Sequence, residues 1–144
     1  MENRYLKDRV TMSMDNATAA VQVLRKRLLA GAIISISARE LTRNPVNAQF
    51  LAGTLPLAIG APSLAQQTGA VLLPVHALQI NSCEFTVIIE RPIELDASQP
   101  RSITGETAAR KYASRLETVV REFPDQWLGW RYLNKDATSE RDRN

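Results

Sequence analysis

The apolar and polar positions between Gly31 and Pro74 form the most informative pattern in the chain. Two apolar runs, Ile33 to Ile36 and Val71 to Val75, are typical of buried strands. Between them a helix is expected to open at Gly60 to Pro62 and to close at Gly69, with apolar residues at helical spacing. Two strands joined through a helix indicate a crossover connection and therefore a parallel sheet.

Two further helices are predicted, one on each side of this stretch. Helical spacing extends over 17–30, and Gly31 is expected to end that helix. A long final helix is expected to be capped by Ser102 or Thr104 and to end at Pro124. One apolar stripe on it is expected to dock on the sheet: Tyr112, Leu116, Val119 and Phe123.

A β-hairpin is predicted between these helices. The strand that ends at Leu78 and a β-rich run from Glu84 to Glu90 flank the turn signal Asn81-Ser82. All the elements together predict one α/β domain with a mixed, mostly parallel sheet and flanking helices. Residues 1–16 are interpreted as an N-terminal lead-in, 17–133 as the domain and 134–144 as a polar tail.

Four segments carry a resemblance to a known family. They are ARELTR at 38–43, FLAG at 50–53, GAPSLAQQTGAVLLPV at 60–75 and FPDQWLGWRYL at 123–133. Together they resemble the C-terminal half of the bacterial lysophospholipid acyltransferase-like superfamily, of the lipid A lauroyl/myristoyl and phosphatidylinositol mannoside acyltransferase type. The resemblance implies a partial lysophospholipid acyltransferase-like fold. It also implies transfer of a fatty acyl group from acyl-CoA or acyl-carrier protein to a glycolipid or lysophospholipid hydroxyl.

The catalytic motif of that family has no counterpart here. In the family a histidine is followed five positions later by an acidic residue, and this motif lies before the matched segment. The chain has one histidine, His76, which follows the Pro74-Val75 pair that resembles the family's late strand and has Asn81 five positions on. We therefore expect no catalytic residue, and a truncated chain that is inactive alone. The alternative is a non-catalytic module that binds lipid or pairs with another subunit.

The ARELTR segment is the candidate substrate-binding loop. Glu40 to Arg43 is similar to the Glu-Gly-Thr-Arg turn that binds the acceptor's phosphate in glycerolipid relatives. In the closer glycolipid relatives the pattern is an acidic residue followed by Arg, Asp and Leu, and here Ala38 replaces the first acidic group. The resemblance implies that the substrate is bound by Arg39, Glu40, Thr42 and Arg43. The alternative is that Arg39 and Glu40 form only a salt bridge within the loop.

Three other segments permit a functional and a structural interpretation. Residues 50–57 (FLAGTLPL) would line an acyl groove in the family geometry, or would simply pack in the core. The cluster of Trp127, Trp130 and Tyr132 with Arg131 and Lys135 suits a membrane interface, and equally an aromatic lid on the core. The basic triplet at 25–27 could contact phosphate, although a solvated helix end is the simpler explanation.

Composition narrows the classes of function. The 144 residues suffice for one globular domain, and a formal charge of +3 permits an anionic membrane surface without requiring it. The lone cysteine, Cys83, excludes an internal disulfide, and one His with one Cys argues against a zinc site. Dispersed basic residues argue against nucleic-acid binding. No metal or resident cofactor is therefore expected, and acyl-CoA or acyl-carrier protein would act as donor substrate.

Expectations for location and partners follow from the same features. The charged start of the chain lacks the apolar run of an export signal, so a cytoplasmic protein, or one peripheral on the inner face of the cell membrane, is expected. A half-domain would expose a sheet edge and an apolar face. The expected partners are thus a lipid or glycolipid acceptor and either further copies of this chain or a missing N-terminal half.

Overall fold

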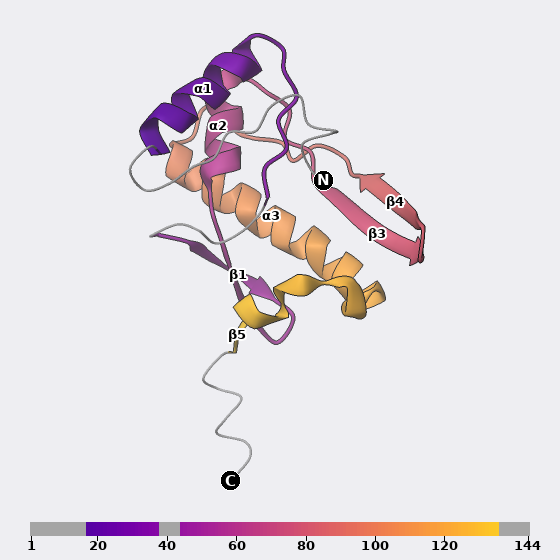
Figure 1. Ribbon diagram of the computed structural model, residues 1–144. Helices are drawn as coiled ribbons and strands as arrows, with labels where there is room; N and C mark the ends of the chain where they lie inside the picture. The colour runs from indigo at the N-terminus through magenta and orange to yellow at the C-terminus, as the bar shows by residue number, and fades with distance from the viewer. Residues whose placement is uncertain (1–16, 38–43, 136–144) are drawn as a thin grey trace.

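The computed structural model describes residues 17–37 and 44–135 (Figure 1). The helices in these ranges are α1 (Ala17–Leu29), α2 (Gly60–Thr68) and α3 (Arg101–Glu122), followed by the short 3₁₀ turns η2 (Pro124–Gln126) and η3 (Leu128–Tyr132). The strands are β1 (Val46–Phe50), β2 (Gly53–Leu57), β3 (Val75–Asn81), β4 (Glu84–Ile89) and β5 (Asn134–Lys135). Helix α3 runs through the middle of the molecule, with α1 and α2 near its start, β1 and β2 along its length and the β3-β4 hairpin towards its end (Figure 1).

The expected mostly parallel sheet is wrong. The described strands form two separate antiparallel sheets, β1-β2-β5 and β3-β4, and no crossover joins parallel strands within these ranges. Residues 32–37 and 70–74 are not strands, and the side chain of Ile33 is fully exposed. Parallel strands are stable only when both faces are covered, and these short apolar runs gain no such cover here. The partial acyltransferase-like sheet is therefore not formed.

The first hairpin includes the segment 50–57, which was expected either to line an acyl groove or to pack in the core. Strands β1 and β2 pair from Val46–Leu57 to Phe50–Gly53, and Leu51 in the tight turn has a positive φ of 53°. Their alternate residues face inward, so the 50–57 segment packs in the core, as the structural interpretation holds. Pro56 is tolerated in β2 because β5 covers only Gly53 and Thr54 on the other side.

The main core lies between this hairpin and α3. Its buried members are Ala48, Phe50, Leu55 and Leu57 from the hairpin and Ala109, Ala113, Leu116 and Val120 from α3. Of the predicted stripe only Leu116 is buried, because the face of α3 that packs on the hairpin also includes the small residues Ala109 and Ala113. The predicted cap is also wrong: Pro100 occupies the N-cap, and the hydroxyl of Thr104 donates instead to the carbonyl of Asp96.

Several other local predictions are confirmed. Helix α2 begins at Gly60 and ends at Gly69, which adopts the left-handed conformation (φ 68°) expected of a C-cap glycine. Gly31, which follows α1, also has a positive φ. Helix α3 ends before Pro124, and β3 and β4 form the predicted hairpin.

The aromatic segment after α3 packs on the core. The Trp127 ring lies 4.9 Å from the ring of Phe50 and 5.0 Å from that of Trp130, as measured between centroids. The Trp130 indole N–H donates to the carbonyl of Pro124, which fixes the turn. These contacts agree with the lid interpretation. Across the described ranges, no helix has the length and apolar character needed to cross a membrane.

Candidate functional site

The four predicted substrate-binding residues lie outside the described ranges. Arg39, Glu40, Thr42 and Arg43 all belong to the segment 38–43, so their arrangement stays a prediction. The described residues with site-like chemistry lie instead on the β3-β4 hairpin, which stands beside α3 (Figure 1). The two faces of this hairpin differ in polarity, and its two edges differ in hydrogen bonding. The strand register determines both differences.

The register fixes which residues share a face. His76 lies opposite Ile88 and Leu78 opposite Thr86, so these side chains point to the same side of the hairpin. His76 and Leu78 are buried, which identifies this side as the inner face. Alternation then places Glu90, two residues beyond Ile88, on the inner face as well.

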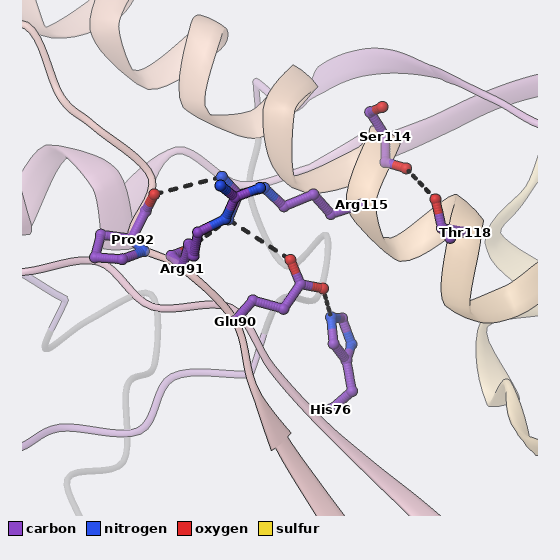
Figure 2. Close-up of polar contacts among 7 residues, drawn as sticks. All are labelled: His76, Glu90, Arg91, Pro92, Ser114, Arg115 and Thr118. Atoms are coloured by element: carbon purple, nitrogen blue, oxygen red, sulfur yellow. Dashed lines mark hydrogen bonds and ion pairs between the residues drawn. The ribbon is translucent and has the colours of Figure 1, made fainter.

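A polar cluster occupies the inner face (Figure 2). His76 Nε2 lies 2.8 Å from Glu90 Oε1, and the other carboxylate oxygen of Glu90 lies 3.6 Å from Arg115 Nη1 on α3. The Arg115 guanidinium also donates to the carbonyls of Arg91 and Pro92. Glu90 therefore lies between the imidazole and the guanidinium, and the cluster ties the end of β4 to α3.

Tyr112 completes this cluster. Its ring stacks on the His76 ring with centroids 6.4 Å apart and planes 13° apart. Burial raises the pKa of the Tyr112 hydroxyl above its usual value, and the nearby negative charge of Glu90 raises this pKa further. The phenol therefore stays neutral well above physiological pH.

The cluster holds an imidazole–carboxylate pair of the kind that can transfer a proton, but its imidazole is shielded from solvent. His76 is only 7% exposed, and Nε2 already faces the Glu90 carboxylate. This arrangement is suited to anchoring the hairpin. Counting five positions from His76 misses the acidic partner because Glu90 is a cross-strand neighbour, 14 residues on. The hairpin signal at Asn81-Ser82 indicates that the end of the second strand lies near His76, but it does not give the register, which shifts between Gln79 and Asn81.

The outer face of the hairpin is apolar and open to solvent. Val75 and Ile89 are opposite each other, as are Ala77 and Val87, and Gln79 and Phe85. The exposed fractions of the four large apolar residues are 53% for Val75, 62% for Phe85, 59% for Val87 and 64% for Ile89. No charged residue belongs to this face. We name these six residues the outer face: Val75, Ala77, Gln79, Phe85, Val87 and Ile89.

The two edges of the hairpin are not equivalent. The Glu90 N–H donates to the Pro74 carbonyl, so even-numbered β4 residues bond to β3 and odd-numbered ones direct their backbone groups to the open edge. On the β3 edge, the Gln126 side chain bonds to both backbone groups of Gln79, accepting from its N–H at 2.7 Å and donating to its carbonyl at 3.0 Å. Within the described ranges β4 pairs with β3 alone, so its edge is open.

A separate polar pocket lies at the start of α3. Its volume is about 550 Å³, and its lining comes from α1, α2, the segment before α3 and the first residue of α3: Gln22, Arg25, Gln66, Gln67, Ala97, Gln99, Pro100 and Arg101. Arg25 is the member of the basic triplet that reaches it. The pocket includes no residue of the hairpin, so it is unconnected with the His76 cluster. Among the described residues, no group of three His, Cys, Asp or Glu side chains could hold a metal ion.

Comparison with models of known protein families gives no match, and comparison with curated proteins gives no significant match. The site is therefore interpreted from its own geometry.

Proposed function

We propose that this chain is a non-catalytic association module that assembles with a second copy of itself through the β3-β4 hairpin, whose outer face is apolar. The observation that carries the proposal is the exposure of four large apolar side chains, each more than half exposed, on one continuous face. Contiguous apolar surface of this kind marks interaction sites, whereas apolar residues scattered singly do not.

The energetics favour a dimer of moderate affinity. Complete burial of a Val, Ile or Phe side chain contributes about 1.5–3 kcal/mol, so the remaining exposed part of each contributes about 1–2 kcal/mol. Two copies together bring eight such side chains, so the gross gain is at most about 8–16 kcal/mol, against the roughly 4–15 kcal/mol that association costs. A net free energy of about −8 kcal/mol, which corresponds to a micromolar dissociation constant, lies within the difference of these two ranges, and we expect a dimer of about this affinity.

Charge favours a second copy over an anionic lipid surface. The outer face has no Lys or Arg that could meet lipid phosphates. The charged residues next to it are Glu84, Glu90 and Arg91, two carboxylates and one guanidinium, so the hairpin region is not basic. An uncharged apolar face is best complemented by another of the same kind, and the second copy supplies one.

Sedimentation velocity of the purified chain tests this proposal. A dimer is expected that dissociates on dilution, and Val87→Glu should weaken it strongly because a carboxylate would be buried in the contact. Thr107→Glu adds the same charge to the exposed side of α3 and should leave the dimer intact. A monomer up to about 100 μM, well above the expected dissociation constant, would refute the proposal. So would equal effects of the two substitutions, or binding to anionic vesicles in place of self-association.

A second candidate function, acyl transfer, is favoured by the His76–Glu90 pair. In that reaction the imidazole would take the proton of the acceptor hydroxyl as its oxygen attacks the thioester of acyl-CoA, and the coenzyme A thiolate would leave. The burial of His76 makes this candidate the weaker one. Transfer of a labelled acyl group from acyl-CoA to glycolipid is the test, with His76→Ala and the surface control Glu94→Gln. Turnover that only His76→Ala abolishes would make this function the correct one.

A further inference from the structure

We infer that the second copy joins along the open edge of β4, antiparallel to it, so that two hairpins form one continuous four-stranded sheet. This inference rests on the proposed self-association and specifies its geometry. The alternative geometry is face-to-face stacking of two outer faces without any hydrogen bond between the chains.

The backbone of β4 presents a row of hydrogen-bonding groups along its open edge. Val87 and Ile89 belong to non-hydrogen-bonded pairs with Ala77 and Val75, so their N–H and C=O groups point away from β3. No contact among the described residues takes up these groups. An exposed strand with such a row of groups is a template for another strand.

The other edge of the hairpin, along β3, is partly occupied. A strand pairing with β3 would need the outward groups of Gln79, and the Gln126 amide already bonds to both of them. The Gln126 side chain reproduces the donor and acceptor of a neighbouring strand at that position. Pairing is therefore directed to β4.

Two-fold symmetry determines the direction of pairing. When the axis is perpendicular to the sheet, the two β4 strands are antiparallel and both outer faces lie on the same side. When the axis lies along the strands, the strands are parallel, and the outer face of one copy lies beside the inner face of the other, which packs on α3. The antiparallel arrangement is therefore the one that brings the two outer faces together.

This geometry also brings apolar residues of the two outer faces into contact. Antiparallel pairing keeps Phe85, Val87 and Ile89 of both copies on the same side of the joined sheet. Their side chains then become cross-strand neighbours across the contact, and the two outer faces merge into one. The inner faces, with their His76 clusters, remain packed on the α3 helix of each copy.

A proline substitution separates edge pairing from face stacking. Val87→Pro keeps an apolar side chain on the outer face but removes the N–H that points to the open edge. We expect it to raise the dimer dissociation constant about tenfold or more, since a hydrogen bond is lost at each of two symmetric positions. Ala77→Pro removes the equivalent N–H on the β3 edge and should leave the dissociation constant within about twofold.

Hydrogen exchange on the unsubstituted chain is a second test of the edge pairing, and it does not depend on the folding of any variant. The amides of Val87 and Ile89 should become protected as the concentration passes through the dissociation constant, while those of Val75 and Ala77 should not. If Val87→Glu weakens the dimer but Val87→Pro does not, and the β4 amides stay unprotected, the association module stands and the edge-pairing geometry is wrong. If Val87→Glu leaves the dimer unchanged, both the proposed function and this inference are wrong.

Discussion

The backbone N–H of Leu51 donates a hydrogen bond to the Glu117 carboxylate, 3.0 Å away and 66 residues later in the sequence. Leu51 is the described non-glycine residue with positive φ, and it forms the turn between β1 and β2. Glu117 lies on α3, which packs against β1. The bond thus secures a strained turn to the helix that carries the core. Backbone strain of this kind persists only where the surroundings determine it.

This contact makes stability depend on pH. The Leu51 N–H lowers the pKa of the Glu117 carboxyl, and hydrogen bonding to Arg121 lowers this pKa further. A carboxyl whose pKa is lower in the folded than in the unfolded state stabilises the fold above the unfolded value, about 4.3. That contribution is lost as the pH falls through the folded pKa.

Glu117→Gln should therefore lower the free energy of unfolding by about 1 kcal/mol at pH 7. The difference from the unsubstituted chain should shrink as the pH falls below about 4. Urea denaturation at pH 7, 5 and 3 measures it. Glu122→Gln, an exposed position on the same helix, is the control. A difference that stays constant with pH would contradict the assigned role of the Leu51 contact.

The inner cluster of the hairpin gives a second prediction. Glu90→Gln removes the charge that faces Arg115 and replaces an oxygen with an amide nitrogen. We expect the free energy of unfolding to fall by about 1–3 kcal/mol, because partly buried groups on α3 and β3 lose a charged partner. Urea denaturation is the measurement, with Glu94→Gln as the exposed control. Equal stability of the two variants would show that the cluster does not anchor the hairpin.

A third prediction concerns the closed edge of β3. Gln126→Ala would free both backbone groups of Gln79, and a hairpin with two open edges can grow in both directions. Light scattering should then detect species larger than a dimer, increasing with concentration. Asp125→Ala, the exposed neighbouring position, should behave as the unsubstituted chain does. Assembly that stops at the dimer in Gln126→Ala would mean that Gln126 does not protect this edge.

A pair of glycines tests the aromatic lid. A Cβ atom at Gly129 would overlap the Trp127 indole, whereas one at Gly60 meets nothing within 4 Å. Gly129→Ala should cost about 1–3 kcal/mol of stability and shift the tryptophan fluorescence, because the indole must leave its place on Phe50. Gly60→Ala should be neutral or stabilising by up to about 1 kcal/mol. Thermal unfolding followed by fluorescence distinguishes them, and a harmless Gly129→Ala would show that the indole is not fixed there.

Local signals in the sequence determined the helices and one hairpin. Glycine at 31 and 69, proline at 124 and helical spacing at α1 and α2 act within a few residues, so they can be interpreted without a partner segment. The Asn81-Ser82 turn and its flanking β-rich runs likewise determined the β3-β4 hairpin.

Only the tertiary structure decided which apolar runs become strands and which chemistry comes together. The same run of apolar residues can form a buried strand or an exposed connection, and the outcome depends on whether another element covers it. Ile33 is fully exposed, whereas Phe50 packs in the core with α3. The His76–Glu90 pair and the Gln79–Gln126 cap join residues 14 and 47 positions apart. Such pairs depend on strand register and on the path of the chain, and no spacing rule along the sequence contains either.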